Sequence, residues 1–307
     1  MSITLRQIQI FLAVAQSKNL SEAADQLNIT KSAVSQSLSD LESRLGVTLL
    51  DRNKNRSILS AEGRSFKSVA DELVRRAMDA EQFFQRPSTG QVHLDVTLSI
   101  GAFYISSMLH EYFASTTWLP EVTVANTAEV SEHLENFTTD LAIVEGPMFN
   151  LDIITEPWLK DELVVVAPKG HRLTQGVATW DQLSKERWIL REPGSSTRIF
   201  FDAQLSQRLS STAITTTINS FEAIIGMVMK GMGLTFMTSK VLTDPFYSHR
   251  IEKVTLPEVF ERQLSLCWHR DKFISRDMEQ WLDFCRQWAK RKEAEAQVSK
   301  TDASSVI

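Results

Sequence analysis

The chain has 307 residues, of which 43% are hydrophobic and 23% charged, and its formal net charge is −5. This length favours about two domains, and the composition excludes a disordered or collagen-like chain. Two cysteines exclude a disulfide scaffold and leave too few thiols for a cysteine-based metal site. The early apolar run, residues 10–15, is far shorter than the roughly 20 residues of a membrane span. We therefore expect a cytoplasmic protein with no signal peptide and no membrane partner.

Basic residues are enriched near the N-terminus. Residues 1–64 contain eight Lys or Arg against six Asp or Glu, a net of +2, so the remainder carries −7. Attraction to phosphate is local, since salt screens charges beyond about 10 Å, and an acidic protein with a basic end can therefore bind nucleic acid. The asymmetry alone is weak evidence, because such a segment is usually a solvated surface.

Residues 1–59 are expected to form a winged helix-turn-helix domain. Apolar residues recur at helical spacing over 4–17. A short helix over 22–27 follows, with Ser21 as its expected N-cap, and a third helix is predicted over 31–45. Two helices joined by a tight turn, the first carrying small alanines, are typical of a helix-turn-helix.

The third helix is bounded by Thr30, its expected N-cap, and by Gly46, which ends it. Its outward face carries short polar side chains, which suit base edges and phosphates in a major groove. The residues expected to contact DNA from this helix are Thr30, Lys31, Ser32, Ser35, Gln36 and Ser39.

The segment 47–59 contains two short apolar pieces around a polar tip that holds Arg52, Lys54 and Arg56. This pattern predicts a β-hairpin wing whose three cations hold the DNA backbone beside the groove. The alternative is a solvated basic loop, but the position directly after a helix-turn-helix favours the wing.

A long helix is predicted from residue 60 to about 85, followed by a linker over 86–90. Its apolar residues alternate in steps of four and three, the spacing of a coiled-coil seam. Such a seam needs a partner surface, most simply a second copy of the chain, and a dimer matches two half-sites on DNA. The seam consists of Phe66, Ala70, Leu73, Ala77, Ala80 and Phe84.

The N-terminal segment resembles the LysR-type transcriptional regulator family. Its specific part is AVSQSLSDLESRLGVTLLDR, and the likeness is strong over 5–64 and looser to about 290. Lys31 and Ser32 depart from the usual Gln and Pro, and Ser-Ala-Glu-Gly replaces Thr-x-x-Gly after the wing. The resemblance implies a transcription factor that binds double-stranded DNA as a homodimer or homotetramer and responds to a small-molecule effector. It implies no enzyme activity and no cofactor, with RNA polymerase as a further candidate partner.

Residues 91–292 are expected to form an α/β domain. The alternation of strands and helices implies a mostly parallel sheet covered by helices. In the family this is a periplasmic-binding-protein-like effector domain with two subdomains, here about 91–163 with 268–292, and 164–267. Residues 293–307 are expected to be a frayed tail. Strands are expected at 94–100, 122–124, 141–144, 163–167, 188–190, 214–218, 234–237 and 264–268, and helices at 103–113, 130–137, 221–230 and 278–288.

Three loops are expected to line a crevice between the subdomains, where such sheets bind ligands. Hydroxyls and backbone N–H groups over 194–198, with the cation of Arg198, suit a small anion, and the alternative is a helix cap with a surface arginine. Glu145 is a candidate to hold a cation or an amine, or to pair with Arg198. The loop after Gly101 lacks the Ser or Thr common in the family, which favours a narrower or more apolar pocket. The expected lining residues are Ala102, Phe103, Tyr104, Glu145, Gly146, Ser195, Ser196, Thr197, Arg198, Asn219 and Ser220.

Three short motifs, REPGSSTR (191–198), EPW (156–158) and NSFEAI (219–224), resemble a branch related to regulators that sense small sulfur-containing oxyanions. No metal or catalytic motif accompanies them, and Cys267 and Cys285 are predicted to be buried and inert. An alternative function is a ligand-binding dimeric module that acts by protein contact. The polar third helix and the basic wing argue against that alternative.

Overall fold

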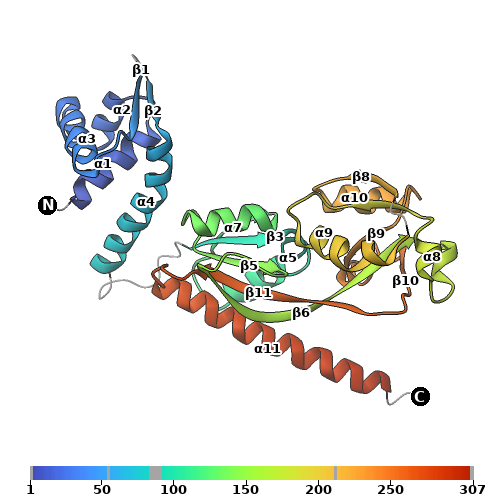
Figure 1. Ribbon diagram of the computed structural model, residues 1–307. Coiled ribbons are helices and arrows are strands. Elements are labelled where there is room, and N and C mark those ends of the chain that lie inside the picture. The colour runs from blue at the N-terminus through green and yellow to red at the C-terminus, as the bar shows by residue number, and fades with distance from the viewer. Residues whose placement is uncertain (1–2, 54–55, 83–91, 211–212, 305–307) are drawn as a thin grey trace. The chain divides into compact units, whose positions relative to one another are not determined.

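Figure 1 shows a computed structural model of the chain, which describes residues 3–53, 56–82, 92–210 and 213–304. Its contacts divide the chain into two compact units. The N-terminal unit comprises Met1–Thr89 with Asn136–Thr138, and the C-terminal unit comprises Gly90–Glu135 with Thr139–Ile307. The helix expected as a separate segment over 60–90 therefore belongs to the N-terminal unit, and the expected linker 86–90 lies outside the described residues.

The N-terminal unit is a winged helix-turn-helix, as expected. Thr30 caps the third helix by accepting a hydrogen bond from the Ala33 backbone N–H at 3.2 Å, and Gly46 ends it with a φ of 71°. The predicted cap at Ser21 is wrong, because the Asn19 carboxamide accepts both first-turn N–H bonds. The elements are α1 (Leu5–Gln16), α2 (Leu20–Gln26), α3 (Lys31–Leu45), β1 (Leu50–Asn53), β2 (Arg56–Leu59) and α4 (Ala61–Gln82).

Helix α4 packs closely on the rest of this unit. The ring of Phe66 lies 5.3 Å from that of Phe11 on α1, and Ala70 is completely buried. A Cβ on Gly63 would lie 2.1 Å from the carbonyl oxygen of Leu49, so only glycine permits this approach. The start of α4 therefore completes the core of the N-terminal unit.

The C-terminal unit is built on a seven-stranded sheet in the order β10-β6-β11-β5-β3-β4, with β9 also paired to β6. A second pair, β7-β8, lies in the same unit. The strands are β3 (His93–Thr97), β4 (Glu121–Ala125), β5 (Leu141–Glu145), β6 (Ile153–Pro168), β7 (Arg187–Leu190), β8 (Ala213–Thr217), β9 (Thr235–Thr238), β10 (Ile251–Val254) and β11 (Phe260–His269). The α-helices are α5 (Leu98–Phe103), α6 (Ile105–Phe113), α7 (Thr127–Glu135), α8 (Trp180–Leu183), α9 (Ser196–Phe200), α10 (Phe221–Met229) and α11 (Arg276–Ser304).

Two long antiparallel strands, β6 and β11, connect the halves of this unit (Figure 1). Leu159 and Leu264 lie in one core, which we assign to subdomain I, whereas Leu163 and Phe260 lie in the core of subdomain II. The change between halves therefore occurs near residue 161 of β6 and residue 262 of β11. The expected boundary at 267–268 was placed too late on β11.

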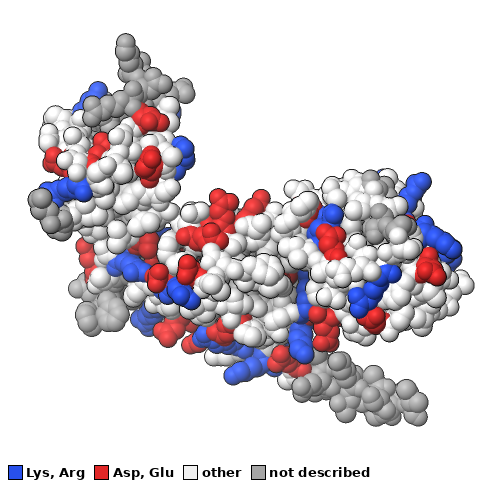
Figure 2. All heavy atoms as spheres, viewed as in Figure 1, with Lys and Arg blue, Asp and Glu red and all other residues white. Residues whose placement is uncertain are grey.

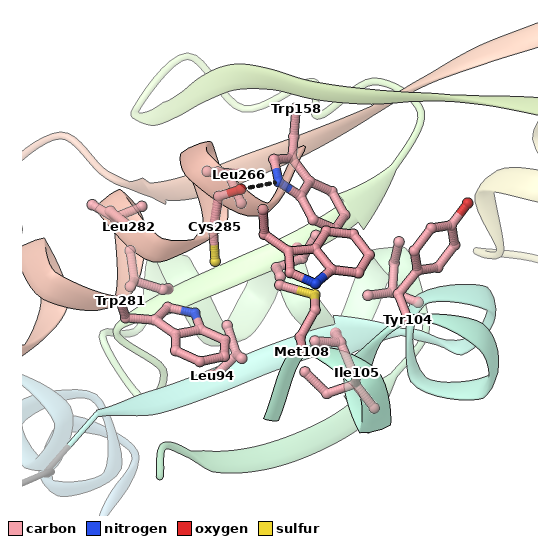
Figure 3. Close-up of a cluster of buried hydrophobic side chains, with 14 of the residues drawn as sticks. Leu94, Tyr104, Ile105, Met108, Trp158, Leu266, Trp281, Leu282 and Cys285 are labelled. Carbon is pink, nitrogen blue, oxygen red and sulfur yellow. Dashed lines mark hydrogen bonds between the residues drawn. The ribbon is translucent and has the colours of Figure 1, made fainter. Parts of the chain in front are cut away.

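Aromatic side chains fill the core of subdomain I (Figure 3). Trp158 stacks on Trp288 with ring centroids 5.6 Å apart, and its Nε1 donates to the Cys285 carbonyl at 2.8 Å. Trp281 is almost fully buried in the same cluster. Helix α11 is thus fixed to the sheet through its apolar face.

Several expected boundaries differ from the structure. The seven-stranded sheet is mixed, since β3-β4 and β3-β5 are parallel pairs whereas the ladders of β6 and β11 are antiparallel. Strand β3 ends at Thr97, and Gly101 lies inside α5, where a Cβ would approach Val124 Cγ2 at 3.0 Å. The expected tail is helical to Ser304, because α11 continues past its buried face. Across the described residues, no helix is both long and apolar enough to span a bilayer.

Candidate functional site

Helix α3 presents one exposed polar face, while Val34, Leu38 and Leu41 bury its opposite face. Two hydrogen bonds order this polar face: the Thr30 and Ser32 hydroxyl oxygens lie 2.9 Å apart, and Gln36 Nε2 donates to Asp40 Oδ1 at 2.9 Å. The exposed face carries each predicted residue: Thr30, Lys31, Ser32, Ser35, Gln36 and Ser39. The structure therefore brings the expected groove-reading residues together on one surface.

The wing is present as the antiparallel pair β1-β2, with Arg52 opposite Ser57 and Asn53 opposite Arg56. Arg52 and Arg56 thus lie on opposite strands next to the tip, and Lys54 lies outside the described residues. On the visible face of the N-terminal unit, acidic and basic side chains are interspersed (Figure 2). The grip of the wing on phosphate stays a prediction.

The expected dimer seam on α4 is only partly free. Ala70 is fully buried and Phe66 is half-buried in the core of its own chain, so Ala70 cannot contact a second copy. Leu73 and Ala80 are exposed, Ala77 is half-buried, and Phe84 lies outside the described residues. The coiled-coil spacing did not distinguish contacts within the chain from contacts between copies.

The candidate effector residues divide into those that meet at the crevice and those that do not. Glu145, at the end of β5, and Ser196 with Thr197, at the start of α9, meet between the two subdomains. Ser195 is also buried, and a Cβ on Gly146, whose φ is 74°, would lie 3.3 Å from Ser196 Cβ. The loops after β5 and before α9 therefore touch.

Arg198 does not pair with Glu145. Its Nε donates to both Asp202 carboxylate oxygens, at 3.0 and 2.9 Å, and its Nη1 donates to the Arg191 carbonyl at 3.2 Å. Asp202 lies four residues after Arg198, one helical turn away, so its carboxylate can pair with the guanidinium. The expectation that Arg198 supplies free charge to an anion or binds Glu145 is wrong, because Asp202 neutralises it.

The other expected lining residues lie in or next to the helices α5 and α10. Ala102 is exposed on α5, and Phe103 packs edge-on against Phe221 of α10 with centroids 5.1 Å apart. Tyr104 is buried beside Trp158, and burial, followed by the charge of Asp161, raises the pKa of its phenol. Asn219 is exposed, while Ser220 caps α10.

Glu145 instead binds Arg262, on the strand that crosses between the subdomains. Arg262 Nη1 lies 2.6 Å from Glu145 Oε2, and its Nε and Nη2 lie 2.8 and 2.7 Å from Asp161 Oδ2. Asp161 and Arg262 are register partners on β6 and β11, and all three side chains are at least 98% buried. We call this set, with Ser99, Ser196 and Thr197, the crevice cluster.

Every oxygen of the Glu145 carboxylate accepts hydrogen bonds. Oε1 accepts from the Ser99 backbone N–H at 2.8 Å, and Oε2 accepts from Ser196 Oγ at 3.3 Å and Thr197 Oγ1 at 3.4 Å. Burial alone would raise the pKa of Glu145, but Arg262 and the Ser99 hydrogen bond more than offset it and hold that pKa below its usual range. Glu145 is therefore ionised at neutral pH.

Sequence reasoning missed Ser99, Asp161 and Arg262. One signal was available: Asp161 shares a strand face with Leu163 and Val165, and Arg262 shares one with Leu264. A charged residue at an inward position needs a partner. The sequence does not show which carboxylate on which strand supplies it.

Both cysteines are free and buried, as predicted. Burial raises the pKa of Cys267 to about 12 and raises that of Cys285 well above its usual value. They belong to different apolar clusters, which argues against a redox pair. Among the described residues, no group of His, Cys, Asp or Glu is arranged to hold a metal ion.

Comparisons with known proteins agree with this division into two units. Residues 5–64 match a family model described as a bacterial regulatory helix-turn-helix protein of the lysR family, and residues 85–290 match the LysR substrate binding domain. The HTH-type transcriptional regulator YeiE of Escherichia coli K12 is 34% identical over 289 residues, covering 93% of this chain and 98% of that one. This relative fits the branch that the sequence motifs indicated. CysL of Bacillus subtilis is 27% identical over 240 residues, covering 76% of this chain and 80% of that one.

Solved structures share the fold. A full-length variant of OxyR from Pseudomonas aeruginosa superposes with a TM-score of 0.73 at 19% identity, covering 93% of this chain and 95% of that one. The regulatory domain of Synechocystis CcmR, solved in complex with 2-PG, superposes with a TM-score of 0.62 at 23% identity and covers 66% of this chain and 98% of that one.

Proposed function

Because the chain belongs to the LysR family of transcriptional regulators, we propose that it binds promoter DNA as a symmetric oligomer and changes transcription when a small oxyanion enters its crevice. The chain is a DNA-binding transcriptional regulator with an effector-binding domain. The finer parts of the proposal are the residues that read DNA, the oligomeric state and the chemical class of the effector. We propose no catalytic activity for it and place it in the cytoplasm, where its promoters are.

The observation that carries DNA reading is the exposed polar face of α3. Ser35 and Gln36 lie on it, and the helix is held from behind by its buried face. A helix presented in this way fits the major groove, where an amide recognises adenine and hydroxyls contact bases or phosphates. Arg52 and Arg56 of the wing bind the phosphates of the adjacent DNA backbone. These contacts position α3 on the DNA without reading its sequence.

The dimer forms through the exposed side of α4. Val69 and Leu73 lie one turn apart on α4 and are 44 and 37% exposed, whereas a surface helix normally turns its apolar side chains toward the protein core. Pairing this side with a second copy places two α3 helices on half-sites about 34 Å apart. A pair of dimers gives the tetramer, and contact with RNA polymerase follows at the promoter.

The effector site is the crevice cluster. A guanidinium, two hydroxyls and a backbone N–H converge on one carboxylate there, and these are the donors that recognise oxyanions. The sulfur-oxyanion branch indicated by the sequence motifs supports the same class of effector. A polar α3 and a DNA-binding family argue against a module that acts by protein contact alone.

Fluorescence anisotropy with the DNA upstream of its own gene tests DNA reading. We expect the wild type to prefer this DNA over a shuffled fragment of equal length and composition. Gln36→Ala should reduce that preference at least about fivefold, because a base contact is worth about 1–3 kcal/mol. The matched control is Gln204→Ala, which removes an exposed amide from the C-terminal unit. Equal affinity of the wild type for both fragments would contradict the proposal.

A further inference from the structure

The donors expected to bind an oxyanion are already engaged by a side chain of the protein itself. Glu145 receives bonds from Ser99 and Ser196, on opposite sides of the crevice, and from Arg262 between them. We propose that the Glu145 carboxylate occupies the oxyanion site as an internal ligand, and that an oxyanion effector binds by displacing it. This inference rests on the proposed function and specifies how the same site works.

The geometry of the hydroxyl contacts favours exchange of the Glu145 carboxylate for an oxyanion. The Glu145–Arg262 contact is short, at 2.6 Å, but Ser196 and Thr197 reach the same oxygen only at 3.3 and 3.4 Å. Three donors thus share Oε2, while Oε1 receives the Ser99 bond. An anion with three or four oxygens offers more acceptors than a carboxylate, and it would satisfy the two hydroxyls at normal distances.

Arg262 is held in place independently of Glu145. Its Nε and Nη2 bind Asp161, and Asp161 Oδ1 accepts from Thr238 Oγ1 at 2.6 Å. Only Nη1 points to Glu145 and Thr197. When Glu145 leaves, Arg262 therefore stays anchored by Asp161 and presents Nη1 to the incoming anion.

Charge explains why Glu145 and an oxyanion exclude each other. Two carboxylates and one guanidinium, all nearly inaccessible to solvent, already give the cluster one net negative charge. A further anion beside Glu145 would add repulsion at close range in a weakly screened site. Binding therefore requires Glu145 to move out.

The position of the cluster links this exchange to regulation. Asp161 and Arg262 lie where β6 and β11 change from subdomain I to subdomain II, while Glu145 and Ser196 come from the two sides. Because Glu145 is 98% buried, its departure requires the contact between these loops to loosen. Exchange of Glu145 for an oxyanion is thus coupled to the relative position of the two halves. An effector shifts an equilibrium between two states only if its affinity for them differs, and this coupling supplies such a difference.

The test compares the full chain with variants that remove the internal ligand. Glu145→Ala deletes the carboxylate, and Glu145→Gln keeps the shape without the charge in case the alanine variant fails to fold. Thermal unfolding is followed in sodium sulfate, sodium sulfite and sodium formate, against sodium chloride at equal ionic strength. We expect these anions to raise the Tm of the variants with a half-saturating concentration at least about tenfold below that for the wild type.

Two controls separate this site from general anion effects. Glu156→Gln removes a carboxylate that binds Arg286 outside the crevice, at 2.8 and 2.7 Å, and it should respond like the wild type. Adding Arg262→Met to Glu145→Gln should abolish the gained response.

The possible results decide both proposals. Equal half-saturating concentrations in the wild type and the Glu145 variants would overturn the internal-ligand inference and leave the oxyanion effector intact. No specific response in any protein would overturn the inference together with the oxyanion class. DNA binding, measured on the same samples, would in that case still stand or fall separately.

Discussion

Replacing Arg262 by methionine should destabilise the C-terminal unit strongly and change its pH dependence. Glu145 and Asp161, whose side chains are only 2 and 1% exposed, would lose their shared cation. Breaking a buried ion pair by removing one partner costs about 3–5 kcal/mol. With roughly 2–4 °C per kcal/mol for a unit of this size, the Tm should fall by about 10 °C at pH 8.

The sign of the pH effect follows from the Glu145 pKa. In the wild type Arg262 lowers this pKa, so the ionised Glu145 adds stability above its unfolded pKa of about 4.3, and this is lost as pH falls through the folded pKa. In the variant burial is the largest remaining effect and raises the pKa of Glu145. The variant therefore gains stability relative to the wild type as the pH is lowered from 8 to 5.

Calorimetry of the full chain at pH 5 and pH 8 measures both effects. The control is Arg286→Met, because Arg286 also binds two carboxylates, Glu156 and Asp283, but is 38% exposed. It should cost at most about 1 kcal/mol. A loss below about 1 kcal/mol for Arg262→Met, or a loss independent of pH, would refute the assignment of a buried charged cluster.

Three further predictions concern the N-terminal unit. Gly63→Ala places a Cβ 2.1 Å from the Leu49 carbonyl oxygen, so circular dichroism should show a loss of at least about 2 kcal/mol in stability, and a neutral result would contradict the packing of α4. Replacing Arg52 and Arg56 by alanine should weaken binding to all DNA sequences and reduce the slope of log K against log salt by about 2, whereas an unchanged slope would argue against the wing contacts. Leu73→Asp should weaken self-association in sedimentation equilibrium without unfolding the unit, because Leu73 is 37% exposed, and an unchanged dimer constant would place the interface elsewhere.

Local signals predicted the DNA-binding unit well. The periodic apolar residues of α3, its cap at Thr30 and its end at Gly46 all depend on neighbours within a few positions, and each is confirmed. The error at Ser21 is also local, since Asn19 is an equally good cap two residues earlier. On α4 the spacing predicted a stripe buried against a second copy, but a stripe does not identify its partner: Ala70 packs within its own chain, whereas Leu73 is exposed.

The crevice shows where sequence reasoning stops. Glu145 and Thr197 were predicted from their loops, but their common partner Arg262 lies 117 residues beyond Glu145 and 101 beyond Asp161. Strand register across the sheet decides that contact, and no local pattern encodes it. Arg198 was predicted to line the effector site from its position in the loop, but the carboxylate of Asp202, one helical turn later, binds it instead.

The central claim is that this chain reads DNA sequence as a symmetric oligomer. Purified full-length protein incubated with sheared genomic DNA at physiological salt, followed by sequencing of the bound fragments, tests it most directly. We predict enriched fragments that share a two-fold-symmetric motif, and a Gln36→Ala protein that no longer enriches it. Binding spread evenly over the genome, with and without added sulfate or sulfite, would contradict the claim.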